Sequence, residues 1–175
     1  PKAGGAGTLL ATFASTPRRV VISGTTLGWA TQAEVGTLAL PGGPAVPLAQ
    51  TLAPAMDVVF DGDQLAWIEN EPLCCGGFLR AVPLVGGVPV ELADLVSPLR
   101  LTRAPDGTLL WIEGGEDPAS DPALRVRTPL GEVATWLAGL QRSPALAVDD
   151  SDVYFVQGWW IKRVPRAGGT PERIA

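Results

Sequence analysis

Histidine is absent from the 175-residue chain, and this absence removes the most common catalytic side chain. Without an imidazole there is no histidine general base, no Ser–His or Cys–His nucleophile pair and no histidine-ligated metal. The sequence also lacks a Gly-x-Ser-x-Gly nucleophile elbow and a phosphate-binding loop. We therefore expect a protein that is not an enzyme and that holds no cofactor.

Basic charge and long apolar runs are also scarce. Acidic residues number 18 against 13 basic ones, so the formal net charge is −5. Because an acidic surface repels phosphate backbones, we expect no nucleic acid as a partner. No segment approaches the roughly 18 consecutive apolar residues that a membrane-spanning helix needs, so we expect no membrane span.

Cysteine occurs only at the adjacent positions Cys74 and Cys75. Neighbouring cysteines cannot staple distant parts of the chain, so the fold does not depend on a disulfide framework. They could close a strained disulfide ring, remain two free thiols, or pair outside this segment, and the sequence leaves these alternatives open. Two adjacent sulfurs without histidine cannot supply four tetrahedral ligands, which argues against a zinc site.

What the sequence does contain is an internal repeat. A turn followed by two apolar residues and an aromatic one recurs four times, with the aromatic residues at Trp29, Trp67, Trp111 and Phe155. An apolar residue, a proline and a glycine pair follow, most clearly at 82–87 and 164–169, and a Leu-Ala or Ile-Ala pair closes each unit. Three motifs that recur in one order indicate tandem copies of one supersecondary unit.

Each unit resolves into four short strands, lettered A to D in chain order. In the last unit the pattern predicts strands over 145–148, 153–156, 160–164 and 171–174. The glycine pair supplies the positive φ angles that a tight C–D hairpin needs. Strand B is apolar on consecutive residues, which is typical of a strand covered on both faces.

A sheet with two apolar faces needs a neighbour on each side, and sheets arranged side by side around an axis meet this need. We therefore predict an all-β protein, a β-propeller of four-stranded antiparallel blades. The predicted blades cover residues 15–50, 51–94, 95–139 and 140–175, and residues 1–14 match the end of a preceding blade, an extra N-terminal outer strand. Because the last unit has its own strand D, a segment of a larger ring is the simplest account. A four-bladed ring with residues 1–14 packed elsewhere is the alternative.

The motif Val-Pro-x-x-Gly-Gly-x-Pro-x-x-Leu-Ala at 82–93, preceded by a turn aspartate and an aromatic strand, resembles the repeat of bacterial TolB-like and NHL-like six-bladed β-propeller proteins. The resemblance covers the whole chain and specifies architecture better than activity. It implies an extracytoplasmic protein, whether periplasmic, cell-surface or secreted, that serves as a binding scaffold. The third unit departs from the pattern at Gly131-Glu132, where the glycine pair is incomplete.

Ligands of propellers usually bind at the face where the D–A and B–C connections lie. The predicted B–C connections carry carboxylates and no Lys or Arg, which favours a cation or a basic partner. A solvated acidic surface that keeps an apolar protein soluble would explain the same carboxylates. The candidate binding residues on this face are Glu69, Glu71, Cys74, Cys75, Glu113, Glu116, Asp117 and Trp159.

Three functions are compatible with this pattern. We favour a non-catalytic binding or scaffold module that recognises a protein or small ligand through the acidic B–C loop face. A calcium-dependent enzyme of the lactonase or lyase type would need a Ca²⁺ site built from carboxylates alone. A purely structural repeat of a larger surface assembly would need no ligand. In each case we expect the remaining blades of the same or another chain as partners.

Overall fold

The computed structural model describes residues 6–71, 76–114, 121–141 and 145–175. The regular elements of these residues are all β-strands, and none of them is a helix that could cross a bilayer. The strands form four sheets, each with four antiparallel strands in chain order. The prediction of an all-β protein with four-stranded antiparallel units is therefore confirmed.

The strand bounds are as follows. The first sheet contains β1 (Arg19–Ser23), β2 (Thr26–Ala30), β3 (Glu34–Ala39) and β4 (Ala45–Gln50). The second sheet contains β5 (Ala55–Asp61), β6 (Gln64–Asn70), β7 (Gly76–Pro83) and β8 (Val90–Val96). The third sheet contains β9 (Pro98–Arg103), β10 (Leu109–Glu113), β11 (Ala123–Arg127) and β12 (Val133–Leu137). The fourth sheet contains β13 (Leu146–Val148), β14 (Asp152–Gln157), β15 (Trp160–Pro165) and β16 (Glu172–Arg173). The strands predicted for the last unit agree with these bounds to within one residue at either end.

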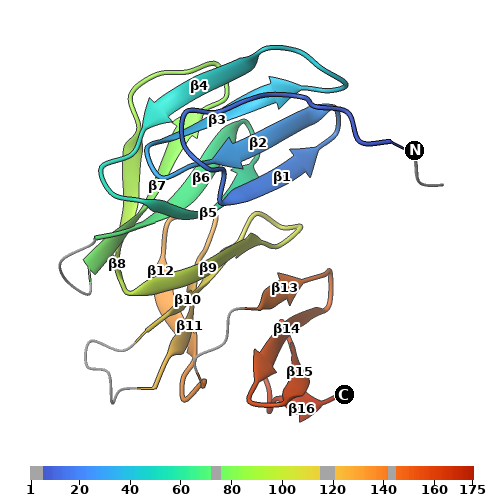
Figure 1. Ribbon diagram of the computed structural model, residues 1–175. Helices are drawn as coiled ribbons and strands as arrows, with labels where there is room; N and C mark the ends of the chain where they lie inside the picture. The colour runs from blue at the N-terminus through green and yellow to red at the C-terminus, as the bar shows by residue number, and fades with distance from the viewer. Residues whose placement is uncertain (1–5, 72–75, 115–120, 142–144) are drawn as a thin grey trace.

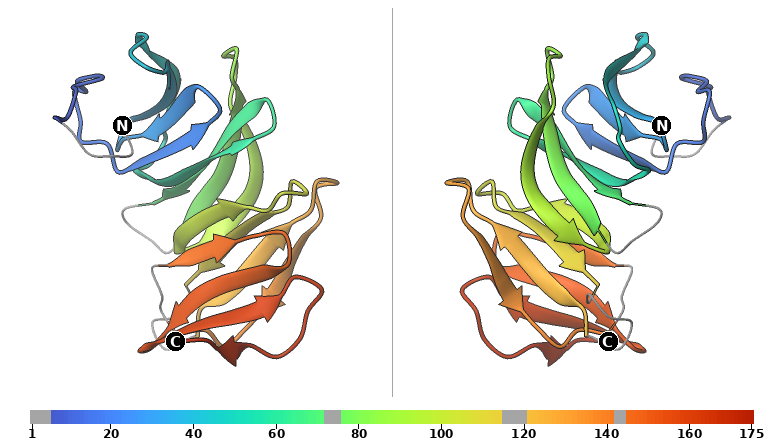
Figure 2. Two further views of the ribbon diagram at one scale, coloured as in Figure 1. Left: turned by 90° about the vertical axis from the view of Figure 1, so that its right-hand side faces the viewer. Right: turned by 90° about the vertical axis from the view of Figure 1, so that its left-hand side faces the viewer.

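The four sheets are arranged around a common centre in the order of the sequence (Figure 1, Figure 2). Strand A of each sheet lies innermost, because β5 contacts β1 on one side and β9 on the other, and β9 also contacts β13. Strand D forms the opposite edge of each sheet. Antiparallel sheets placed side by side about one axis make a β-propeller, and each sheet is one of its blades.

The apolar faces are buried in the junctions between successive blades. Trp67 belongs to the apolar cluster between the first and second blades, Trp111 to the cluster between the second and third, and Phe155 to the cluster between the third and fourth. These three residues hold equivalent positions in the repeat and are at most 2% exposed. Each faces the blade that precedes it, so the repeated aromatic residue closes a junction.

Glycine pairs form the C–D hairpin turns, as predicted. Gly86 and Gly87 have φ angles of 86° and 139°, and Gly168 and Gly169 have φ angles of 93° and 140°. L-residues with side chains rarely adopt these angles, so the turns require glycine. In the third blade Gly131 has a φ of 92°, and one glycine is enough to turn the chain where the motif is incomplete.

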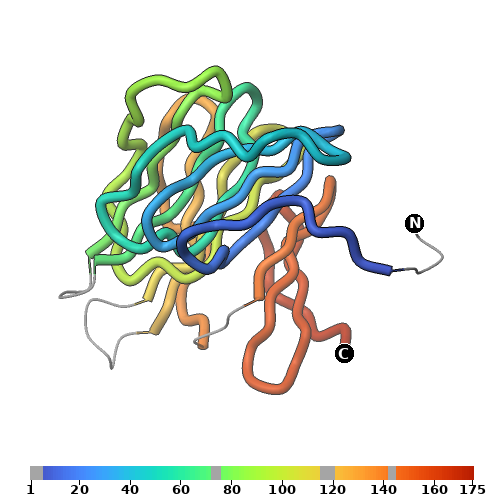
Figure 3. The backbone as a smooth tube through the Cα atoms, turned by 45° about the horizontal axis from the view of Figure 1, so that its top comes forward, coloured from blue at the N-terminus to red at the C-terminus, as the bar shows by residue number. Residues whose placement is uncertain are grey.

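Residues 6–14, which were expected to form part of an outer strand of a preceding blade, form no strand. A strand needs a sheet edge with which to exchange hydrogen bonds, and this segment instead runs beside the first blade (Figure 3). Phe13 lies against Trp29 with the ring centroids 4.8 Å apart. The segment therefore covers part of the face that a preceding blade would cover, and Trp29 is 1% exposed.

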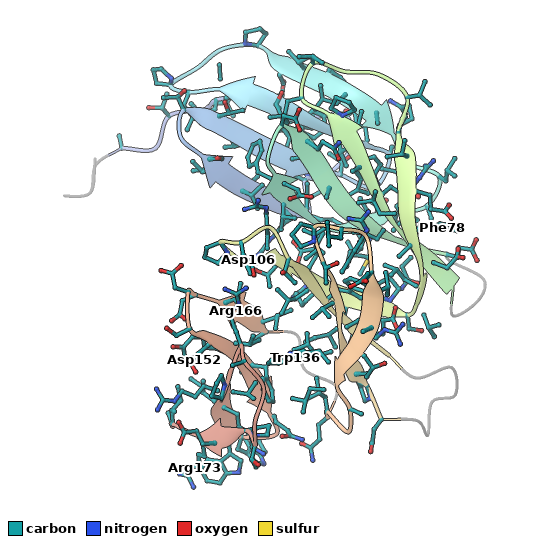
Figure 4. All side chains as sticks on the ribbon, turned by 180° about the vertical axis from the view of Figure 1, so that it is seen from behind. Phe78, Asp106, Trp136, Asp152, Arg166 and Arg173 are labelled. Carbon is teal, nitrogen blue, oxygen red and sulfur yellow. The ribbon has the colours of Figure 1, made fainter. Side chains whose placement is uncertain are left out.

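Ion pairs between neighbouring blades add to the apolar junctions. Asp61 Oδ1 of the second blade lies 2.7 Å from Arg103 Nε of the third. Arg166 of the fourth blade pairs with Asp106 of the third, and Figure 4 shows the two side chains on facing elements. All four side chains are partly exposed, so each pair contributes only about 0–1 kcal/mol to stability. These pairs orient the blades, and the apolar junctions supply the larger part of the stability.

Candidate binding face

The antiparallel topology places the B–C and D–A connections at one end of the propeller and the A–B and C–D turns at the other. The first end is termed here the B–C end. It contains the connections after β2, β6, β10 and β14 together with those between successive blades. The candidate residues Glu69, Glu71, Glu113 and Trp159 lie at this end. The other candidates, Cys74, Cys75, Glu116 and Asp117, lie outside the described residues.

Glu69, near the end of β6, is fully buried and accepts hydrogen bonds on both carboxylate oxygens. Trp67 Nε1 donates to its Oε1 at 2.6 Å. The backbone N–H groups of Leu52 and Ala53 donate to its Oε2 at 3.1 and 3.2 Å, and Arg80 Nη1 lies 3.9 Å from Oε1. The carboxylate therefore ties the junction tryptophan to the connection that enters the second blade.

The same arrangement recurs in the third blade. Trp111 Nε1 donates to Glu113 Oε1 at 2.9 Å, and Arg125 Nε lies 3.6 Å from Glu113 Oε2. Residues two apart on a strand share one face, so a Trp-x-Glu sequence places the carboxylate beside the indole N–H. The repeated Trp-Ile-Glu triplet of the sequence was the signal for this hydrogen bond. The sequence analysis gave both glutamates a binding role and did not predict the bond.

The first and fourth blades have other residues at the position of these glutamates. In the first blade Thr31 lies two positions after Trp29, and the Trp29 indole nitrogen is buried without a hydrogen-bond partner among the described residues. In the fourth blade Phe155 has no N–H to satisfy, and Gln157 takes the place of the glutamate. Gln157 Nε2 donates to the Gly139 carbonyl at 3.3 Å, so it also binds the connection that enters its blade.

A hollow of about 350 Å³ opens at the B–C end between the second and third blades. Its lining residues are Asp94, Val96, Glu113, Gly114, Asp121, Ala123 and Arg125. Asp94 and Asp121 are exposed, whereas Glu113 faces Arg125. The hollow, named here the acidic hollow, therefore carries more negative than positive charge. Among the residues that the structure describes, no group of three or more carboxylates or thiols is arranged to hold a metal ion.

Trp159 lies in the two-residue turn between β14 and β15 and is 94% exposed. The adjacent Trp160 is 40% exposed, and the Arg173 guanidinium carbon lies 3.2 Å from the centroid of its ring. Glu71 lies in the B–C connection of the second blade, where its backbone N–H donates to the Gly76 carbonyl at 3.0 Å. The B–C end thus carries an acidic hollow and an aromatic turn, which lie on different blades.

A further cavity, of about 410 Å³, faces the axis beside the fourth blade and is lined by Arg19 and Arg100 together with mainly apolar residues of that blade. Arg19 Nε lies 3.0 Å from Asp57 Oδ1, and the Leu101 N–H donates to Asp57 Oδ2 at 3.2 Å. Burial raises the pKa of Asp57 above its ordinary value of 3.8, although the hydrogen bond from Leu101 and the charge of Arg19 act in the opposite direction. Asp57 is therefore a buried acid that links three innermost strands.

The fold is that of a β-propeller, and similar solved structures support this class. A protein assigned as TolB in Agrobacterium tumefaciens superposes with a TM-score of 0.74 and 17% identity, over 95% of this chain and 64% of that one. A chain of a nidogen/laminin complex gives 0.71 and 18%, over 85% and 60%. A protein assigned as a gluconolactonase gives 0.68 and 14%, over 94% and 64%. This chain thus spans about 60–64% of the length of these structures.

The resemblance to TolB-like propellers that the repeat indicated is confirmed for the fold. No family model and no curated protein sequence matches the chain. At identities this low the similarity concerns the backbone arrangement, and it does not carry ligands or activities from one protein to another.

The role of Glu69 can be tested with a substitution. Glu69→Ala is expected to lower the free energy of unfolding by about 3 kcal/mol, because the buried Trp67 indole N–H and two backbone N–H groups lose their acceptor. The matched control, Glu91→Ala, removes an exposed carboxylate of β8 and should change it by less than about 0.5 kcal/mol. Urea denaturation measures both, and equal effects would contradict the structural role of Glu69.

The buried acid Asp57 predicts a pH dependence. Because the pKa of Asp57 is raised in the folded state, the folded state binds this proton more tightly than the unfolded state does. The contribution of Asp57 to stability therefore falls as the pH rises above the ordinary pKa of an aspartate. The free energy of unfolding of the wild type minus that of Asp57→Asn should therefore decrease from about pH 4 to about pH 7. The exposed control Asp63→Asn should give a difference that falls much less, and a rising difference for Asp57→Asn would refute the account.

Proposed function

We propose that this chain is a non-catalytic β-propeller binding module that takes up a cationic group of a protein or small ligand in the acidic hollow of the B–C end. The observation that carries the proposal is the hollow itself, which is concave and rimmed by exposed carboxylates. Its volume of about 350 Å³ falls in the range of small-ligand sites, roughly 300–1,000 Å³. A lysine or arginine side chain fits both its size and its charge.

The charge of the hollow comes from two particular residues. Glu69 lies near Arg80, and Glu113 lies near Arg125. The charges of these two glutamates are therefore largely compensated within the protein. Among the described residues Asp94 and Asp121 form no ion pair and are exposed to solvent. Uncompensated carboxylates at a concave surface attract cations and steer a basic partner toward the site.

We also propose that further blades, of the same or another chain, cover the free face of the fourth blade. In the third blade the paired residues Ile112 and Leu124 are fully buried against the fourth. Val156 and Ile161 form the equivalent pair in the fourth blade, and Ile161 is 44% exposed. The longer chains of the similar structures are consistent with such neighbours.

An extracytoplasmic location belongs to this proposal, and the fold similarity to a TolB protein supports it. The repeat motif of the sequence points in the same direction. In such a location a rigid propeller with a concave acidic face serves as a docking scaffold for secreted or surface-bound partners.

Binding of a basic probe tests the acidic hollow. Pentalysine is expected to bind the chain at low salt, and the double variant Asp94→Asn/Asp121→Asn should weaken this binding by about tenfold. The matched control is Asp63→Asn/Asp150→Asn, which removes two exposed carboxylates at the opposite end. Isothermal titration calorimetry measures the three affinities. Equal losses in both double variants would show that net charge alone attracts the peptide, and the hollow would not be the site.

The second candidate is a calcium-dependent lactonase, which the fold similarity to a protein assigned as a gluconolactonase favours. If the binding module is correct, Ca²⁺ and EDTA should give the same Tm, and gluconolactone should not be hydrolysed faster than in buffer. Calorimetry and a pH-stat assay measure these quantities. A Tm raised by Ca²⁺, with lactone hydrolysis that EDTA abolishes, would establish the enzyme instead.

A further inference from the structure

We propose that the aromatic turn of the fourth blade binds a saccharide. The site is a hollow of about 340 Å³ lined by Gln141, Gln157, Gly158, Trp159, Trp160 and Lys162. It is separate from the acidic hollow, and it extends the proposed function because it rests on the B–C end being the binding end. The argument uses the exposure of Trp159, the fixed geometry of the turn and the chemistry of the lining.

The turn holds the backbone of Trp159 in a defined place. Gln157 and Trp160 are paired across the hairpin, so only Gly158 and Trp159 connect the two strands. Gly158 has a φ of 61°, and a Cβ at this position would lie 3.0 Å from Gln141 Oε1. Glycine therefore allows both the tight turn and the approach of the Gln141 amide, which brings an amide and an indole to the same small hollow.

The neighbouring side chains are also held in place. Figure 4 shows Arg173 at the lower end of the fourth blade in that view. Its guanidinium lies over the Trp160 ring, and this contact restrains the indole. Gln157 Nε2 donates to the Gly139 carbonyl, which leaves the Gln157 carbonyl oxygen as an acceptor. The hollow thus combines a restrained Trp160 ring with oriented polar groups. The protein side chains would therefore lose little conformational freedom when a ligand binds.

The Trp159 indole is 94% exposed, which leaves a large flat apolar surface in water. Such a surface gains free energy when another apolar surface covers it. A pyranose ring presents a flat face of C–H groups, and its hydroxyl groups both donate and accept hydrogen bonds. Glutamine amides likewise donate and accept, and the Lys162 ammonium donates, so the lining matches both properties of a sugar.

Charge and shape favour a saccharide over a peptide. Among the residues that the structure describes, the lining contains one ammonium group and no carboxylate, so it suits a neutral or acidic sugar and not the basic partner of the acidic hollow. Peptides are usually held by main-chain hydrogen bonds to a sheet edge or by deep apolar pockets. The lining comes from a hairpin turn and the connection before the blade, and it offers neither.

Oligosaccharide titration tests the proposal. Cellohexaose, maltohexaose and chitohexaose are the probes, and at least one should bind at millimolar concentration or below and shift the Trp159 emission to shorter wavelength. Trp159→Ala should weaken that binding by about tenfold or more, and Trp159→Phe should weaken it less because a smaller ring remains. Calorimetry measures the affinities, and a thermal melt verifies that each variant is folded.

The matched control is Leu130→Ala, which removes an apolar side chain that is 89% exposed in a C–D turn at the opposite end. It should leave the affinity unchanged. Absence of binding by all three oligosaccharides, or an equal loss in Leu130→Ala, would overturn the proposal. Pentalysine binding to Trp159→Ala separates the two sites. This binding should be unchanged if the acidic hollow is correct, even where the saccharide site is wrong.

Discussion

The constraint on which the structure depends is that each blade has two apolar faces. In β6 the five residues from Leu65 to Glu69 are all buried, and all five residues of β10 are buried as well. A strand buried on consecutive residues is covered on both sides, and a single sheet cannot cover itself. Each blade therefore needs a neighbour on either side, and the arrangement around an axis supplies both neighbours to the second and third blades.

This constraint also explains the polar groups of the B–C end. A tryptophan in a junction brings a buried N–H with it, and that donor needs an acceptor. Glu69 and Glu113 supply the acceptor, while Glu69 and Gln157 also bind the connection that enters their blade. The fourth blade has Phe155 in place of tryptophan and Gln157 in place of glutamate, so the carboxylate is absent where the indole is absent. Glu69 and Glu113 thus have a structural role before any role in binding.

The architecture could be predicted from the sequence because its determinants are local and repeated. The aromatic residue of strand B and the glycine pair of the C–D turn recur in tandem, so the strands of the last unit were placed to within one residue. The segment before β1 was harder to predict, because its motifs match a strand but its described residues 6–14 pair with no sheet. It packs Phe13 on Trp29 instead.

The candidate site could be predicted only in part. The topology determines the end of the propeller at which a residue lies, but it does not determine how deeply the side chain is buried. Glu69 and Glu113 were placed at the correct end, yet their carboxylates point into the junctions. Asp94 was not among the candidates, since it lies on strand D of the second blade and reaches the acidic hollow only when the blades pack together. The exposure of Trp159 was easier to anticipate, because a turn this short leaves little to cover it.

The packing of blade on blade can be measured directly at Gly28 and Leu65. A Cβ at Gly28 in the first blade would lie 2.9 Å from Leu65 Cδ1 in the second, so Gly28→Ala should destabilise the protein. Leu65→Ala removes the nearest of the obstructing atoms, while Phe60 Cζ and Val21 Cγ2 remain 3.1 Å from that position. Gly28→Ala added to the Leu65→Ala variant should therefore cost less than it does in the wild type. Free energies of unfolding for the four proteins of this cycle give the answer. A cost of Gly28→Ala that is the same in both backgrounds would show that the two blades do not face each other as described.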